Sequence, residues 1–142
     1  MEIIVGCIIS KDDKILMVQE AKERYCGKWS FPSGCLRENE DIFTGAIRLA
    51  LETTGHKVLL NKMLPIRITQ TDGKLVFTYT FLGNILDFNY KKYNEELVSD
   101  KKFISVNEIR KMGKNIIDKQ NIFDLLDAYE NNKIFELDQI FI

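Results

Sequence analysis

The sequence is poor in cysteine, histidine and proline, and each shortage narrows what the protein can be. Its three cysteines, Cys7, Cys26 and Cys35, form no CxxC pair, so we expect no disulfide framework and a reducing, cytoplasmic location. One histidine, His56, cannot build a zinc site. Two prolines and no low-complexity stretch leave no linker, so we expect a single domain over residues 1–142.

The charge balance argues against a nucleic-acid-binding protein, and the hydrophobicity pattern argues against a membrane-spanning or secreted one. The net charge is -1, with 20 basic and 21 acidic residues, so no basic excess attracts nucleic acid and we expect no nucleic-acid binding. No apolar run reaches the length of a membrane span, and MEIIVGCIISKDDK lacks the basic and long apolar regions of a signal peptide. The composition is that of an ordinary globular domain with a core.

Short runs rich in β-branched residues predict strands along much of the chain. The runs EIIVGCII and KILMVQ flank the polar KDDK, which predicts a hairpin. Asp72-Gly73 predicts a second hairpin, with KLVFTYTFLG as the returning strand. The stretch from 56 to 70 is typical of a strand that breaks at Pro65, and FISV is typical of a short last strand.

Two helices are predicted among these strands. The first should run from about Asp41 to Thr54 and end at Gly55, a natural left-handed cap residue. NIFDLLDAY predicts the second, and Ser105 or Asn107 is a candidate cap for a shorter turn. The apolar tail KIFELDQIFI should pack onto the domain. Hairpins rather than regular βαβ repeats predict an α+β fold or a compact α/β sandwich.

The first helix carries the residues with chemical potential. Four apolar residues share one face and should pack on the sheet: Ile42, Ala46, Leu49 and Ala50. On a neighbouring face Arg48 and Glu52 are four residues apart and can pair. Glu40 lies just before the helix, at the end of the Gly34 loop, so Glu40 and Glu52 can point toward one space. Because magnesium takes one or two protein carboxylates plus waters and phosphate, two convergent glutamates are the minimum for such a site.

The stretch GCLRENEDIFTGAIRLALETTGH resembles the box of the Nudix hydrolases, G-x5-E-x7-R-E-U-x-E-E-x-G-U, in which U is aliphatic. The matching positions, at the right spacing, are Gly34, Glu40, Arg48, Glu52 and Gly55. The preceding WSFPSG resembles the family's lead-in to the box. The resemblance implies an α/β/α sandwich around a mixed β-sheet. It also implies Mg²⁺- or Mn²⁺-dependent hydrolysis of a nucleoside diphosphate linked to another moiety.

The resemblance further implies roles for single residues. Glu40, Glu52 and the Gly34 loop would hold the metal, and Arg48 would orient Glu52 for catalysis. A nucleotide-type small molecule would be bound by four residues: Gly34, Trp29, Arg24 and Phe77.

Departures from the box weigh against full activity. Leu49 and Thr53 stand where the family has glutamates, and His56 replaces the final aliphatic residue. Loss of a general base alone costs about 10²–10⁴ in rate. The protein is therefore either a weak or altered hydrolase or a catalytically impaired relative that binds a nucleotide or a protein partner. The carboxylates that would compensate are Glu38, Asp41, Glu95 and Glu96.

Each site residue also has an ordinary structural interpretation. Glu52 can be a surface partner of Arg48, and Glu40 can complement the helix dipole. Trp29 is more often a core residue than a ligand contact. Arg24 lies in the charged loop 20–28, which would ordinarily be solvated. The face formed by Phe77, Tyr79 and Phe81 can be core rather than a base-stacking surface.

Overall fold

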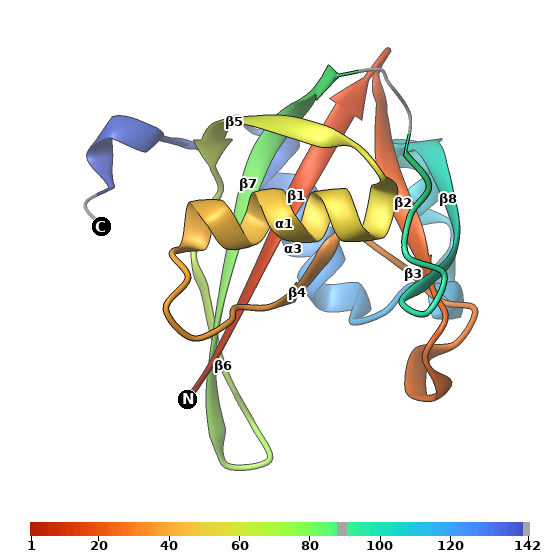
Figure 1. Ribbon diagram of the computed structural model, residues 1–142, viewed down its shortest axis with the longest axis horizontal. Helices are drawn as coiled ribbons and strands as arrows, with labels where there is room; N and C mark the ends of the chain where they lie inside the picture. Colours follow the sequence, from red (N-terminus) through yellow and green to blue (C-terminus); the bar gives the residue numbers. More distant parts are fainter. Residues whose placement is uncertain (88–90, 141–142) are drawn as a thin grey trace.

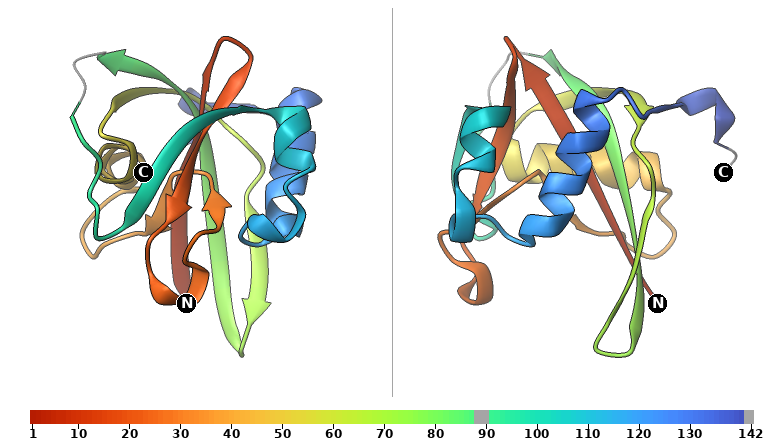
Figure 2. Two further views of the ribbon diagram at one scale, coloured as in Figure 1. Left: turned by 90° about the vertical axis from the view of Figure 1, so that its right-hand side faces the viewer. Right: turned by 180° about the vertical axis from the view of Figure 1, so that it is seen from behind.

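The computed structural model describes residues 1–87 and 91–140. Helix α1 (Ile42–Thr54) crosses one face of a mixed sheet, and α3 (Lys119–Glu130) crosses the opposite face, as Figure 1 and Figure 2 show. A short α2 (Val106–Arg110) precedes α3 on the same side. Three single turns of 3-10 helix complete the helical part of the described chain: η1 (Glu23–Tyr25), η2 (Gly113–Asn115) and η3 (Leu137–Gln139).

Nine strands form the sheet within these residues. They are β1 (Glu2–Lys11), β2 (Lys14–Glu20), β3 (Trp29–Ser30), β4 (Ser33–Cys35), β5 (Lys57–Met63), β6 (Arg67–Thr71), β7 (Lys74–Asp87), β8 (Val98–Ser105) and β9 (Phe135–Glu136). The main path is β3-β2-β1-β7-β5-β9, while β4 pairs with β1, β6 with β7 and β8 with β2. At the centre β1 and β7 run parallel, with Val5 opposite Tyr79, and the sheet is therefore mixed.

Local signals explain most element boundaries. The turn between β1 and β2 places Asp12 and Asp13 at φ 51° and 61°, and the β6–β7 turn places Asp72 and Gly73 at 51° and 76°. Such left-handed pairs match the right-handed twist of a hairpin, and both predicted hairpins are confirmed. Pro65 lies in the gap between β5 and β6, where the sequence predicts a break.

The helix ends follow the predicted capping chemistry. The Asp41 carboxylate accepts a hydrogen bond from the Thr44 amide at 2.8 Å, and Gly55 ends α1 at φ 78°. Of the two candidate caps for the short helix, Ser105 is the one used, because its hydroxyl accepts from the Glu108 amide.

The core divides between the two faces of the sheet. Val5, Cys7 and Ile9 of β1 belong to the cluster that packs against α1, whereas Ile8 belongs to the cluster that packs against α3. In the α1 cluster the Phe43 and Phe81 rings lie 5.2 Å apart between centroids. Helix, sheet and helix thus form three layers, and the predicted α/β/α sandwich is confirmed.

The C-terminal tail packs less completely than its composition predicts. Strand β9 pairs with the edge of β5, and Leu137 and Ile140 contact the α1 cluster, but Phe135 is 46% exposed. Residues 141 and 142 of this tail lie outside the described residues. In the described part of the chain, the helices are too short or too polar to cross a membrane.

Candidate functional site

The segment that joins β4 to α1 is fastened to the sheet at its start and to the helix at its end. Gly34 pairs with Val5 of β1, and the Leu36 amide donates to the Ile3 carbonyl at 2.9 Å. Asp41 then caps α1. The loop therefore holds a fixed position under the first turns of the helix (Figure 1).

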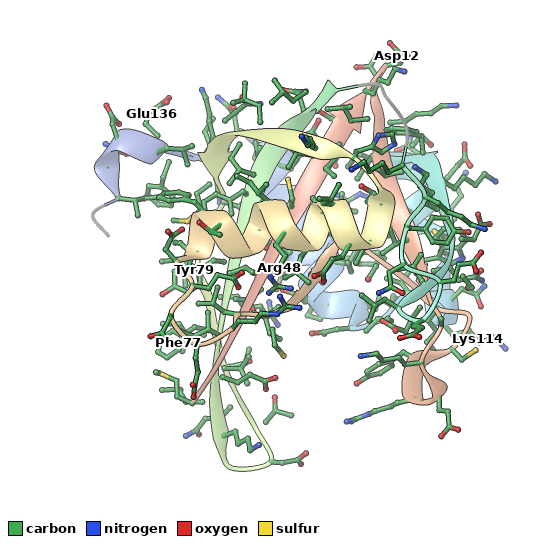
Figure 3. All side chains as sticks on the ribbon, viewed as in Figure 1. Asp12, Arg48, Phe77, Tyr79, Lys114 and Glu136 are labelled. Carbon is green, nitrogen blue, oxygen red and sulfur yellow. The ribbon has the colours of Figure 1, made fainter. Side chains whose placement is uncertain are left out.

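Arg48 is the centre of the polar cluster at this loop. Its Nε and Nη2 donate to the two carboxylate oxygens of Glu40 at 2.7 and 2.9 Å, a bidentate pair. Nη1 donates to Glu52 at 3.2 Å, and Nη2 also reaches the Cys35 carbonyl at 3.1 Å. Figure 3 places the Arg48 side chain between α1 and the β4 segment. One guanidinium thus joins the loop, the strand and the helix.

Partial burial strengthens the pair between Arg48 and Glu40. Their side chains are 16% and 10% exposed, so solvent screens their attraction weakly. Hydrogen bonding by Arg48 lowers the pKa of Glu40 from 4.5 to about 2, and the pKa of Arg48 is raised in turn, first of all by the hydrogen bond with Glu40. Both groups are therefore fully charged near neutral pH.

The second carboxylate is shared with a residue that sequence reasoning missed. Arg37 donates through Nη2 to Glu52 at 3.3 Å, and its backbone amide donates to Glu40 at 3.1 Å. The Arg37 side chain is 65% exposed, whereas that of Glu52 is 27% exposed. Arg37 lies between Gly34 and Glu40, at a position for which the box specifies no residue, so only its place in the folded loop connects it with Glu52.

The two box positions that lack the family's glutamates are buried. Leu49 is 6% exposed, and a Cβ added at Gly34 would lie 2.7 Å from its Cδ2, so the Leu49 side chain covers the backbone of β4. Thr53 is 5% exposed, and its hydroxyl donates to the Leu49 carbonyl at 2.6 Å. These side chains act as packing groups, and Gly34 is the residue that lets Leu49 approach so closely.

The donors at this site, as they are arranged, do not fit a divalent cation. Each carboxylate oxygen of Glu40 and Glu52 already accepts a hydrogen bond from Arg48 or Arg37. Nowhere in residues 1–87 and 91–140 do three or more His, Cys, Asp or Glu side chains gather as a metal site. The metal-binding role expected for Glu40, Glu52 and the Gly34 loop stays a prediction.

The carboxylates that were expected to replace the two missing glutamates are used elsewhere or lie in other places. Asp41 is used as the cap of α1. The Asn94 amide donates to the Glu52 carbonyl at 2.7 Å, so the segment with Glu95 and Glu96 passes beside α1, but Glu95 pairs with Lys92. Glu38 is exposed on the loop.

The other end of α1 carries a second polar cluster. Lys101 of β8 donates through Nζ to the Thr54 carbonyl at 2.6 Å, and the same nitrogen lies 2.9 Å from Nε2 of His56. Burial lowers the pKa of Lys101 to about 8 and also lowers the pKa of His56. A neutral His56 ring can accept from Lys101, and the pair closes the C-terminus of the helix.

Of the four expected nucleotide contacts, only Gly34 lies at the Arg48 cluster, and no described hydrogen bond joins the other three residues to that cluster. Trp29 packs partly buried against the α3 cluster, and its carbonyl accepts from the Ile117 amide at 2.9 Å. The Arg24 guanidinium carbon lies 5.2 Å from the centre of the Tyr25 ring in the exposed loop. Phe77 is half-buried on β7, near Tyr79 (Figure 3). Their substrate roles stay predictions.

Comparison with known proteins identifies the family of this chain. Residues 2–126 match the model of the NUDIX domain. The chain is 36% identical over 64 residues to Nudix hydrolase 2 of Arabidopsis thaliana, which covers 44% of this chain and 23% of the plant protein. Across this protein and three further Nudix relatives, the match covers 17–37% of the relatives' own length.

Two further relatives cover more of both chains. The 8-oxo-dGTP diphosphatase of Buchnera aphidicola is 26% identical over 118 residues, 69% of this chain and 90% of that protein. The solved structure of a NUDIX hydrolase from Nitrosomonas europaea has a TM-score of 0.89 at 24% identity and covers 99% of this chain and 96% of its own. At that identity the structural likeness shows a shared fold.

Proposed function

The chain belongs to the Nudix family, and from this premise we propose that it binds a nucleotide-type ligand while its metal-dependent hydrolysis is weak or lost. The family acts on nucleotide-type substrates and generally uses divalent metals. The observation that supports the proposal is the burial of Leu49 and Thr53, which fill two positions where the family has glutamates.

The charge balance at the site supports the same proposal. Arg48 and Arg37 together offset the two negative charges of Glu40 and Glu52. A cation such as Mg²⁺ or Mn²⁺ binds more tightly to carboxylates that are not already paired with a positive side chain. At this site the cation would have to displace an arginine from its carboxylate. Metal binding at the box should therefore be weak.

A second candidate is slow metal-dependent hydrolysis of a nucleoside diphosphate linked to another moiety. It is favoured by the exposure of Arg37, whose 3.3 Å contact with Glu52 is the longest ion pair of the cluster. Exposed pairs contribute little, so Arg37 can turn away and release Glu52 to a cation. Arg48 would then orient Glu52, as the family resemblance implies.

The nucleotide contacts belong to the same proposal. The Gly34 loop would approach the diphosphate, and Trp29, Arg24 and Phe77 would contact the rest of the ligand. The half-buried Phe77 ring supports a stacking role, because aromatic faces accept any base. The three free cysteines support a cytoplasmic location.

Calorimetry and a release assay on the same ligands test both candidates. ADP, ADP-ribose and dGTP are titrated in EDTA, and product release is then measured with Mg²⁺ or Mn²⁺. We expect at least one ligand to bind in EDTA and no metal-dependent release above the protein-free rate. Glu52→Gln is the matched control, since it keeps the shape of the side chain and removes its charge.

Each result of this test separates the candidates. Release that needs metal and disappears in Glu52→Gln would establish the slow hydrolase. Failure of all three ligands to bind, with or without metal, would refute nucleotide binding, and the protein-partner hypothesis would then lead.

A further inference from the structure

A cavity of about 370 Å³ lies beside α3, away from the Arg48 cluster. Its walls come from the β5–β6 connection, which supplies Pro65 and Ile66, from Arg67 at the start of β6, and from α3. Figure 2 shows α3 on the face of the sheet opposite α1, so this cavity is separate from the Nudix box. Its volume is in the range of small-molecule pockets.

Two of the residues that line this cavity each carry a buried polar atom that lacks a partner. Nε of Arg67 and Oδ1 of Asn121 are shielded from solvent and make no hydrogen bond with any residue that the structure describes. Leaving such a group unpaired costs about 1–3 kcal/mol, so orphaned groups are rare in folded proteins. One of the two atoms is a donor and the other is an acceptor.

The neighbouring polar groups are already paired and hold Arg67 in place. Asp124 accepts from Nη1 of Arg67, and its other oxygen accepts from the Gln120 amide at 2.8 Å. The hydrogen bond from Arg67 also lowers the pKa of Asp124, so this carboxylate stays charged. The ion pair thus occupies Nη1 of the guanidinium, and Nε is left as a buried donor without a partner among the described residues.

We propose that this cavity binds a planar ligand edge on which a hydrogen-bond acceptor stands next to a donor. A carboxamide has such an edge, and so does a nucleobase. The ligand oxygen or ring nitrogen would accept from Nε of Arg67, and the ligand N–H would donate to Oδ1 of Asn121. Apolar wall residues would pack against the rest of the ring: Pro65, Ile66, Leu125 and Ala128. Small side-chain rotations of the kind that commonly accompany binding would open the two atoms to the ligand.

NMR with matched small probes tests the proposal. Benzamide carries the required edge, whereas N,N-dimethylbenzamide keeps the ring and the acceptor but has no N–H. Benzamide should shift the Arg67 Nε–H signal and the backbone amides of α3, and the dimethyl compound should bind at least about tenfold more weakly, a difference of about 1.4 kcal/mol. Adenine serves as the nucleobase probe, and tighter binding of adenine than of benzamide would assign the site to a base.

Two variants localise the effect. Asn121→Leu removes the acceptor at similar volume, and Arg67→Lys keeps the charge that faces Asp124 but removes Nε. Each should weaken benzamide binding at least about tenfold. Without ligand, Asn121→Leu should melt no lower than the parent, because it removes an unpaired buried group.

Three results would overturn the site. They are no shift with benzamide or adenine up to about 10 mM, equal affinity for the dimethyl compound, and unchanged binding in both variants. If a water molecule pairs with the two buried atoms and neither probe binds, this is the first of these results and the site is overturned. The proposal does not rest on the Nudix box, so Glu52→Gln must leave probe binding unchanged.

Discussion

Restoring the two missing glutamates should make the stability of this protein depend on metal. Leu49→Glu with Thr53→Glu gives three carboxylates, together with Glu52, within five consecutive residues of one helix. Leu49 and Thr53 are 6% and 5% exposed, so in the absence of metal the new carboxylates are forced into a packed region.

The expected cost follows from what the structure packs at these positions. Removing the Leu49 contacts with Gly34 and with the buried cluster beneath α1 costs about 2–5 kcal/mol. Losing the hydrogen bond from Thr53 to the Leu49 carbonyl adds about 1 kcal/mol. In EDTA the double variant should therefore melt roughly 6–24 °C below the parent, from a total cost of about 3–6 kcal/mol at about 2–4 °C per kcal/mol.

Metal should recover part of this loss. A cation at 100 times its dissociation constant stabilises the folded state by about 2.7 kcal/mol, so Mn²⁺ should raise the melting temperature by roughly 5–10 °C. The parent should not respond, because Arg48 and Arg37 already engage its two carboxylates. Calorimetry should give a Mn²⁺ affinity for the double variant only.

The matched control is Leu49→Gln with Thr53→Gln, which has the same shape without the charge. It should lose similar stability and regain none with Mn²⁺. If the glutamate variant folds by circular dichroism and melts at the same temperature with and without Mn²⁺, positions 49 and 53 do not face a common cation site. The interpretation of the box as a disarmed metal site would then be wrong.

Three further outcomes are expected from the polar clusters. Arg48→Met should lower the free energy of unfolding, measured in urea, by about 3 kcal/mol, because it leaves the nearly buried Glu40 carboxylate without its cation. A loss below about 1 kcal/mol would contradict this role of Arg48. Since the pKa of Glu40 falls from 4.5 to about 2 on folding, its stabilisation should be complete above pH 4.5 and disappear as the pH falls toward 2. Urea midpoints of Glu40→Gln should then fall less over this range than those of the parent. The Nζ of Lys101 should titrate near pH 8 in NMR of the reductively methylated protein. Because the pKa of this group is 10.5 in the unfolded chain, its contribution to stability should rise with pH between 8 and 10.5. A titration midpoint near 10.5 in the folded protein would refute the burial of Lys101.

Features set by neighbouring residues were predicted well from the sequence. The Asp41 cap, the Gly55 stop and the Asp72-Gly73 turn each depend on the backbone preferences of a few adjacent residues, and all three are confirmed. The pairing of Arg48 with Glu52 follows from helical spacing alone and is confirmed at 3.2 Å.

Contacts between distant segments were beyond the sequence. Thr53 is 5% exposed, and its burial depends on what packs over the end of α1. The approach of Lys101 to Thr54 requires β8 to lie beside β2, which no local pattern specifies. The single domain over residues 1–142 and the metal and substrate roles of the box residues stay predictions.

The parallel pairing of β1 with β7 has a consequence for how the chain reaches its native state. Val5 finds Tyr79 only after the whole box loop and α1 have been synthesised, so the central contact of the sheet has a high sequence separation. Loop-closure entropy opposes such a contact, and folding dominated by distant pairings is slow. During synthesis on the ribosome, the apolar face of α1 therefore stays uncovered until β7, which carries Phe81, has emerged. A nascent chain that stalls before β7 exposes this apolar surface, and we expect such a chain to aggregate or to be bound by chaperones.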